Sequence, residues 1–128
     1  MRLLLDTHAF LWWVEDASAL PRKARAAIAN PDNECFLSLV SAWEMAIKLS
    51  LGKLKLPGAI ERFVPQQLAE NGFSQLPIDF RHVARVASLA FHHRDPFDRL
   101  LAAQAVEEGL TIVSADRIFV KYGVPRVW

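Results

Sequence analysis

The hydrophobic and polar positions of the chain form short apolar runs that alternate with longer segments of helical periodicity. The apolar runs predict strands at residues 3–5, 34–39, 73–78 and 110–113, and residues 124–128 predict a last edge strand. The helical patterns cover residues 7–14, 20–28, 41–49, 60–71, 80–89 and 99–108, with a short helix around 117–122. Strands that alternate with helices predict an α/β fold with a mostly parallel central sheet flanked by helices.

Two of the helices have clear start signals. Ser41 and Glu44 have the Ser-x-x-Glu spacing of a capping box, which predicts that a helix begins there, after the second strand. In the late helix, Asp95 is the predicted N-cap, Pro96 occupies the first helical position and Asp98 follows in the first turn. Both helices therefore begin beside acidic side chains.

Two further helical segments have features that affect how they fold. Pro65 lies inside the 60–71 segment. Because proline lacks the amide proton that a helix interior uses, we expect two short helices or a kink there. The 80–89 segment and the residue after it carry apolar side chains on one side, which is typical of a helix that packs against a core; these are Val83, Val86, Ala87 and Ala90.

The composition limits the class of protein. Of the 128 residues, 52% are hydrophobic and 23% are charged, so we expect one globular domain that comprises residues 1–128. The net charge of +1 argues neither for nor against a nucleic-acid partner. No apolar run approaches the ~20 residues of a membrane span, and a strand this close to the N-terminus leaves no room for a signal peptide. With Cys35 as the single cysteine, we expect a cytoplasmic protein without disulfide bonds.

Acidic side chains lie where the predicted strands end. Asp6 follows a strand of three leucines, and an ionised carboxylate at the end of a buried strand costs free energy unless another group compensates it. Glu44 and Asp116 follow two later strands, and Asp98 can reach the same edge from the start of its helix. Because ligands bind at the carboxyl ends of parallel strands, we expect these four carboxylates to share one pocket.

Each acid also has a local explanation that needs no shared pocket. Asp6 suits an N-cap, Glu44 a capping box, Asp98 the first turn of a helix and Asp116 a turn. A shared pocket has a different consequence, because two carboxylates ~5 Å apart repel by roughly 3 kcal/mol at an effective dielectric constant near 20. Such a pocket implies raised pKa values or bound cations, and hard oxygen ligands favour Mg²⁺ or Mn²⁺ over Zn²⁺.

Other side chains that could carry chemistry have simpler interpretations. The adjacent pair His92–His93 is typical of solvated loop histidines. No glycine occurs in residues 6–10, so the first strand is not followed by a dinucleotide-binding loop. Trp12 and Trp13 are neighbours on one helix and cannot both face the same core, so we expect an apolar patch near the site that binds a partner. The alternative is that a second helix covers both indoles.

Four motifs in order resemble those of PIN-domain ribonucleases, and more narrowly those of the VapC toxins of bacterial type II toxin–antitoxin systems. They are Leu3-Leu4-Leu5-Asp6-Thr7-His8, Ser41-Ala42-Trp43-Glu44, the segment from His93-Arg94-Asp95-Pro96-Phe97-Asp98 to Ala105, and Val113-Ser114-Ala115-Asp116. The resemblance covers nearly the whole chain, and the segment 94–105 is its most specific part. It implies a PIN-like three-layer sandwich, with a mostly parallel sheet of four to five short strands between helices.

The same resemblance implies a function and a set of site residues. Asp6, Glu44, Asp98 and Asp116 match the acidic quartet of the family, which holds Mg²⁺ (or Mn²⁺) for the hydrolysis of phosphodiester bonds in RNA. Asp95 is assigned to helix capping. The expected activity is that of a metal-dependent endoribonuclease, the toxin of a toxin–antitoxin pair.

The resemblance also implies partners. These are a cognate VapB-type antitoxin, an RNA substrate and a second copy of the chain in a homodimer. Since an acidic pocket repels phosphate, the RNA needs basic groups at the rim, and Arg99 and Lys48 are the predicted contacts. An alternative from a different class is a receiver-like interaction module, whose acids bind Mg²⁺ without catalysis. RNA degradation that requires Mg²⁺ distinguishes the two.

Overall fold

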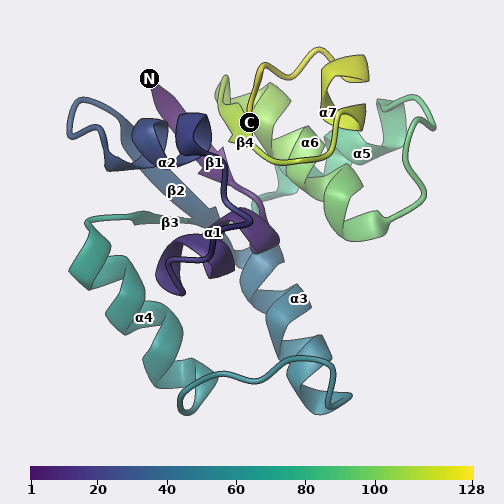
Figure 1. Cartoon of the computed structure of the whole chain (residues 1–128). Helices are drawn as coiled ribbons and strands as arrows, with labels where there is room; N and C mark the ends of the chain where they lie inside the picture. The colour runs from purple at the N-terminus through teal and green to yellow at the C-terminus, as the bar shows by residue number, and fades with distance from the viewer.

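Five short strands form one parallel sheet at the centre of the protein (Figure 1). The computed structural model describes residues 1–128. The strands are β1 (Arg2–Leu5), β2 (Glu34–Ser38), β3 (Ser74–Leu76), β4 (Thr111–Val113) and β5 (Arg126–Val127). Their order across the sheet is β3-β2-β1-β4-β5, and every neighbouring pair is parallel. The predicted α/β class, parallel sheet and number of strands are therefore confirmed.

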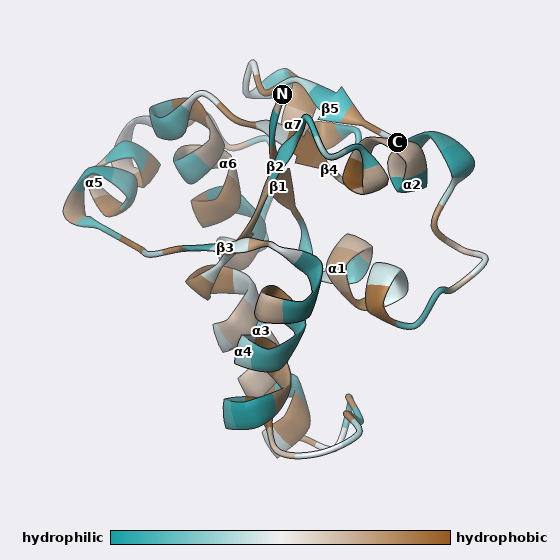
Figure 2. Ribbon diagram, turned by 90° about the vertical axis from the view of Figure 1, so that its left-hand side faces the viewer, coloured by the Kyte–Doolittle hydropathy of each residue, from teal (hydrophilic) through white to brown (hydrophobic).

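Helices cover both faces of this sheet. They are α1 (Thr7–Val14), α2 (Arg22–Ala29), α3 (Leu39–Ser50), α4 (Ile60–Asn71), α5 (Phe80–Ser88), α6 (Pro96–Glu108) and α7 (Ile118–Lys121). In Figure 2, α5 and α6 lie on one side of the strands and α1 and α2 on the other. No helix combines the length and the apolar character that crossing a membrane requires.

Alternating side chains of the central strands divide the core into two clusters. Leu3 and Leu5 point into a cluster with α1, α2 and α4, whereas Leu4 points into a cluster with α6 and α7. This is the period of two that a strand imposes, and it explains why β1 is an unbroken apolar run. Helix α3 contributes to both clusters, through Met45 and Val40, because it runs from the carboxyl edge of the sheet.

The predicted capping box at Ser41 is wrong. Helix α3 begins at Leu39, because the side chain of Ser38 accepts a hydrogen bond from the Val40 amide at 2.9 Å and serves as N-cap. Ser41 is consequently a buried helical residue whose hydroxyl has no partner in the protein. Glu44 lies beyond the first turn of the helix, so capping does not explain its presence.

Helix α4 runs from Ile60 to Asn71 without interruption, so the predicted division at Pro65 into two short helices is wrong. Pro65 is exposed, whereas Phe63, Val64 and Leu68 are buried on both sides of it along the chain. Packing of this apolar stripe against the core holds one helix, although Pro65 leaves one carbonyl group without its helical donor.

The apolar side of α5 is largely uncovered. The buried residue of this helix is His82, whereas Phe80 is 82% exposed and Val83 is 51% exposed. The amphipathic pattern therefore identified the helix correctly, but its apolar side is not the side that packs on α6.

Candidate metal-binding and active site

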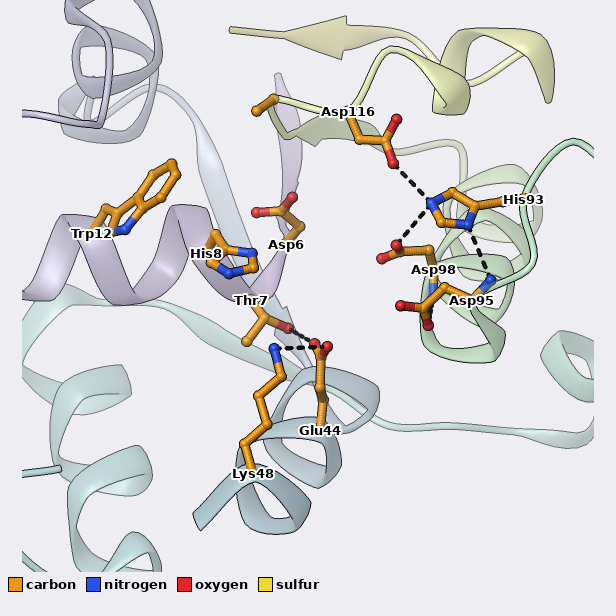
Figure 3. A pocket seen from close by; sticks show the side chains of 11 residues that line it. Asp6, Thr7, His8, Trp12, Glu44, Lys48, His93, Asp95, Asp98 and Asp116 are labelled. Atoms are coloured by element: carbon orange, nitrogen blue, oxygen red, sulfur yellow. Dashed lines mark hydrogen bonds and ion pairs between the residues drawn. The ribbon is translucent and has the colours of Figure 1, made fainter. Parts of the chain in front are cut away.

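The acidic residues meet in one pocket at the carboxyl ends of the central strands (Figure 3). Its volume is about 440 Å³. The lining residues are Asp6, Thr7, His8, Trp12, Glu44, Lys48, His93, Asp95, Asp98, Ala115 and Asp116. They come from the three helices α1, α3 and α6 and from the loops that precede α1 and α6 or follow β4, so the predicted convergence of the four carboxylates is observed.

Asp6 lies where β1 ends and α1 begins. Its amide donates a hydrogen bond to the Val113 carbonyl at 3.1 Å, which continues the ladder between β1 and β4 and brings Asp6 beside the segment that carries Asp116. Its carboxylate accepts a hydrogen bond from the Ala9 amide at 2.8 Å and caps α1. Burial raises the pKa of Asp6, and the nearby Glu44 raises it further, while hydrogen bonds oppose the rise.

Glu44 faces the pocket from α3 and is held from two sides. The Thr7 hydroxyl donates a hydrogen bond to Oε1 at 2.6 Å, and Lys48 Nζ lies 3.3 Å from Oε2, one turn along the same helix. Thr7 directly follows Asp6, so the start of α1 fixes both carboxylates. The residue type of Thr7 alone did not indicate this contact.

Asp98 is the carboxylate that its surroundings perturb most. Burial raises its pKa to about 7, and the charges of Asp95, Glu44 and Asp6 raise it while His93 lowers it. Asp95 caps α6 as predicted, because its Oδ1 accepts hydrogen bonds from the amides of Phe97 (2.8 Å) and Asp98 (3.4 Å). Asp98 makes no such capping bond, so its side chain is not needed to start the helix.

Asp116 and His93 complete the pocket. Asp116 Oδ1 accepts a hydrogen bond from the Ile118 amide at 2.9 Å, while Oδ2 accepts one from His93 Nε2 at 2.8 Å. The same His93 nitrogen lies 3.0 Å from Asp98 Oδ2. The interpretation of His93 as a solvated loop residue is wrong, because the loop before α6 folds back and turns the ring into the pocket. His92, in contrast, is exposed and packs against the Tyr122 ring.

A buried network fixes α3 relative to α6, the helices that carry Glu44 and Asp98. The Ser38 hydroxyl at the start of α3 donates a hydrogen bond to Gln104 Oε1 in α6. Gln104 Nε2 donates to the Pro77 carbonyl at 3.2 Å, and both Ser38 and Gln104 are fully buried. The separation of the two acid-bearing helices thus depends on buried polar groups with satisfied hydrogen bonds.

Arg99, which was predicted to bind RNA, is a buried residue with an exposed fraction of only 6%. Its guanidinium donates hydrogen bonds to the carbonyls of Ala90 (2.9 Å), Val86 (3.3 Å) and Leu89 (3.4 Å), and to the Tyr122 hydroxyl (3.3 Å). These carbonyls lie at or just after the end of α5, where the regular helical hydrogen bonds stop. The Val86 and Ala90 carbonyls also accept hydrogen bonds from the amides of Leu89 and His92. Arg99 therefore stabilises the end of α5 and is not available to a substrate. Lys48, the other predicted RNA contact, lines the pocket.

The expected patch of exposed indoles is also absent. Trp12 and Trp13 are both partly buried and pack against the core cluster on the α1 side. Trp13 Nε1 donates a hydrogen bond to Asn71 Oδ1 at 3.0 Å, whereas Trp12 lies between the rings of His8 and Trp128. Because other elements cover both sides of α1, adjacent indoles are accommodated. Trp12 nevertheless forms one wall of the acidic pocket.

The donor set fits a divalent cation. Ligand atoms of His93, Asp98 and Asp116 all lie within 4.8 Å of one another, and Asp6 and Glu44 line the same pocket. Hard carboxylate oxygens in this number are the ligands that Mg²⁺ and Mn²⁺ prefer. The raised pKa of Asp98 points the same way, because a bound cation would offset the repulsion and burial that disfavour the ionised form.

The raised pKa predicts that Asp98→Asn stabilises the protein at alkaline pH in EDTA. The folded-state pKa of about 7 exceeds the unfolded value of ~3.9, so the folded protein binds more protons between these pH values and loses stability as pH rises through them. Asparagine does not titrate, so the variant should gain about 2 kcal/mol over wild type between pH 5 and pH 8, allowing for partial exposure. Thermal melts of wild type and Asp98→Asn at both pH values measure this difference. If the stability of the two proteins changes equally with pH, the raised pKa of Asp98 is contradicted.

Three comparisons with known proteins agree with this geometry. Residues 3–125 match the family model described as PIN domain. Ribonuclease VapC22 of Mycobacterium tuberculosis is 30% identical over an alignment 129 residues long, which spans 98% of this chain and 98% of the relative. Ribonuclease VapC16 of the same organism is 39% identical over 62 residues, or 48% of this chain and 44% of the relative.

Solved structures of similar fold are toxin–antitoxin complexes. VapBC2 from Rickettsia felis bound to a DNA fragment from their promoter superposes with a TM-score of 0.71 at 15% identity, covering 98% of this chain and 97% of the other. DNA-bound VapBC from Salmonella typhimurium has a TM-score of 0.68 at 18% identity and covers 98% and 96%. At these identities the likeness concerns the fold. The match of residues 3–125 to the family model shows that the chain belongs to the PIN domain family.

Proposed function

We propose that this protein is a metal-dependent endoribonuclease, the toxin of a type II toxin–antitoxin pair, and that residues 1–128 form a single PIN domain that acts in the cytoplasm. The observation that carries this proposal is the convergence of Asp6, Glu44, Asp98 and Asp116 in one pocket of a PIN domain. The relatives named Ribonuclease VapC support the substrate class.

The four carboxylates are proposed to be the metal ligands, with Mg²⁺ as the expected ion and Mn²⁺ as a possible substitute. A divalent cation held by carboxylate oxygens supplies Lewis-acid chemistry, which activates water and neutralises charge that develops on a phosphate. The protein's own contribution is to hold the carboxylates in place. Thr7 and Lys48 orient Glu44. The Ala9 amide in the first turn of α1 orients the Asp6 carboxylate.

Basic side chains next to the pocket provide a path for the RNA backbone. A second pocket of about 480 Å³ adjoins the first and shares Glu44, Lys48 and Asp95 with it. Lys48, Lys53 and Arg94 contribute positive charge to its lining. Phosphates that follow these cations would lead the strand towards the carboxylates, which repel phosphate on their own.

Cleavage assays with purified protein test the proposal. RNA should be cut in Mg²⁺, and EDTA should stop the reaction, because the carboxylates are proposed to act through a divalent cation that EDTA removes. A protein that binds Mg²⁺ but leaves every RNA intact would support the non-catalytic interaction module instead. Sequencing the 5′ ends of RNAs cut after induction in cells would identify the target.

We also propose a VapB-type antitoxin as partner, since the similar solved structures are VapBC complexes. An arginine or lysine of the antitoxin would enter the pocket, attracted by Asp6, Glu44 and Asp98. Trp12 would contact the segment that carries this cation, because it forms a wall of the pocket.

The antitoxin proposal predicts that Trp12→Phe weakens binding of the neighbouring gene's product by about tenfold, a typical loss at an interface aromatic residue. Phenylalanine preserves most of the packing against the core. Calorimetry measures the affinity, and cleavage should fall as the complex forms. Val120→Ser is the matched control, because Val120 is 57% exposed and lies outside the pocket. Binding without inhibition of cleavage would contradict the proposed position.

The uncovered apolar residues of α3 and α5 are the proposed contact surface of a homodimer. Both helices pack against α6. Their exposed apolar side chains include Leu39 (38%), Trp43 (54%), Phe80 (82%) and Val83 (51%). Exposed residues of this size commonly mark interaction surfaces, and a two-fold dimer would bury the same residues on both copies. Light scattering during size-exclusion chromatography measures the mass directly.

A further inference from the structure

His93 makes contacts in the pocket that the proposed function does not use. Its Nε2 donates a hydrogen bond to Asp116 Oδ2 at 2.8 Å and lies 3.0 Å from Asp98 Oδ2 (Figure 3). On the other side of the ring, Nδ1 accepts a hydrogen bond from the Asp95 amide at 3.1 Å. The ring is therefore fixed between the backbone of its own loop and two carboxylates from different parts of the chain.

The hydrogen bond at Nδ1 determines what Nε2 can do. An imidazole nitrogen that accepts a hydrogen bond carries no proton, so the proton of the neutral ring is on Nε2. Histidines that bind metals have the opposite arrangement, because the nitrogen away from the metal donates its proton to a carbonyl or carboxylate. His93 Nε2 is thus a hydrogen-bond donor to the carboxylates, although its distance alone would also suit a ligand.

We propose that the His93 N–H competes with the divalent cation for Asp98 and Asp116, and so weakens metal binding at the proposed site. The inference rests on the proposed metal-binding function. One oxygen atom of each carboxylate faces Nε2, and a cation bound by those two atoms would replace their contacts with the ring. Even without a cation, the imidazole N–H lowers the electrostatic repulsion between the two carboxylates. This reduces the free energy that is gained when a cation binds them.

Two substitutions separate the roles of the two ring nitrogens. In His93→Asn, the side-chain oxygen can accept the Asp95 amide as Nδ1 does, but nothing replaces the Nε2 donor. In His93→Gln, the amide nitrogen occupies the position of Nε2 and can still donate, while the acceptor at the δ position is lost. His92→Ala controls for changes in the loop, because His92 is exposed and lies outside the pocket.

The experiment is calorimetric titration of Mg²⁺, and separately Mn²⁺, into the full-length protein after treatment with EDTA and dialysis. We expect His93→Asn to bind about tenfold more tightly than wild type, the size expected for a lost hydrogen bond to a charged group. His93→Gln and His92→Ala should stay within about threefold of wild type. Thermal melts should agree, with a larger metal-induced rise in Tm for His93→Asn than for the other proteins.

Two results would overturn the inference alone. Weaker binding by both His93→Asn and His93→Gln would make His93 a ligand, and unchanged binding by His93→Asn would make its contacts irrelevant to the metal. In either case wild type would bind the cation and Asp98→Asn would not, so the proposed metal site would stand. If wild-type protein shows no saturable binding, or if Asp98→Asn binds equally well, the proposed site itself is wrong and the inference fails with it.

Discussion

Asp98→Asn is expected to reduce Mg²⁺-dependent RNA cleavage by about a thousandfold, since losing a metal ligand removes several kcal/mol of transition-state stabilisation. Asp6→Asn should have a similar effect. The fold should survive both changes, because asparagine can still cap α1 at position 6 and Asp98 makes no capping bond. Cleavage of a fixed RNA substrate, with a thermal melt of each variant, measures both properties.

Asp32→Asn is the matched control for this charge change, because Asp32 is exposed in the turn before β2 and lies outside the pocket. It should cleave RNA like wild type. An Asp98→Asn protein that cuts at the wild-type rate would refute the assignment of the carboxylate quartet. A loss of activity accompanied by unfolding would instead indicate a structural role for the side chain.

Arg99→Ala is expected to lower the free energy of unfolding by about 3 kcal/mol, because the hydrogen bonds of the buried guanidinium to three carbonyls at the end of α5 and to the Tyr122 hydroxyl are lost. Urea denaturation measures this loss.

Lys48→Ala is expected to affect RNA binding and not stability. Its free energy of unfolding should stay within about 0.5 kcal/mol of wild type, while RNA binding weakens because a phosphate contact is lost.

Arg94→Ala distinguishes a general effect of positive charge from the specific role of Arg99. Arg94 is exposed and contributes to the second pocket, so its removal should leave stability unchanged and weaken RNA binding as Lys48→Ala does. If Arg99→Ala were as stable as wild type and bound RNA more weakly, Arg99 would be a substrate contact despite its burial.

The order of strands and helices could be predicted from the sequence because each element carries its own periodic pattern. Leu3–Leu5 is buried on both faces, and an unbroken apolar run is what such a strand requires. The convergence of Asp6, Glu44, Asp98 and Asp116 could also be predicted, since parallel strands bring their carboxyl ends to one edge of a sheet. These conclusions need no knowledge of side-chain directions.

The start of α3 could not be predicted in the same way. Ser38 and Ser41 are both suitable N-caps, and the spacing of Ser41 to Glu44 favoured the wrong one. The structure selects Ser38 because β2 ends there, paired with Leu76 of β3, and because the Ser38 hydroxyl also reaches Gln104 in α6. The choice between two equivalent local signals was made by contacts with distant residues.

The sequence by itself determined the α/β architecture and the four carboxylates, whereas the tertiary structure decided which of their neighbours act with them. Arg94 and Arg99 are both basic and close in sequence, but only Arg99 is buried and donates hydrogen bonds to the carbonyls at the end of α5. His92 and His93 are adjacent, yet only His93 is turned into the pocket by the Asp95 amide. The direction of a side chain in a loop depends on where distant donors and acceptors lie, and periodicity carries no information about them.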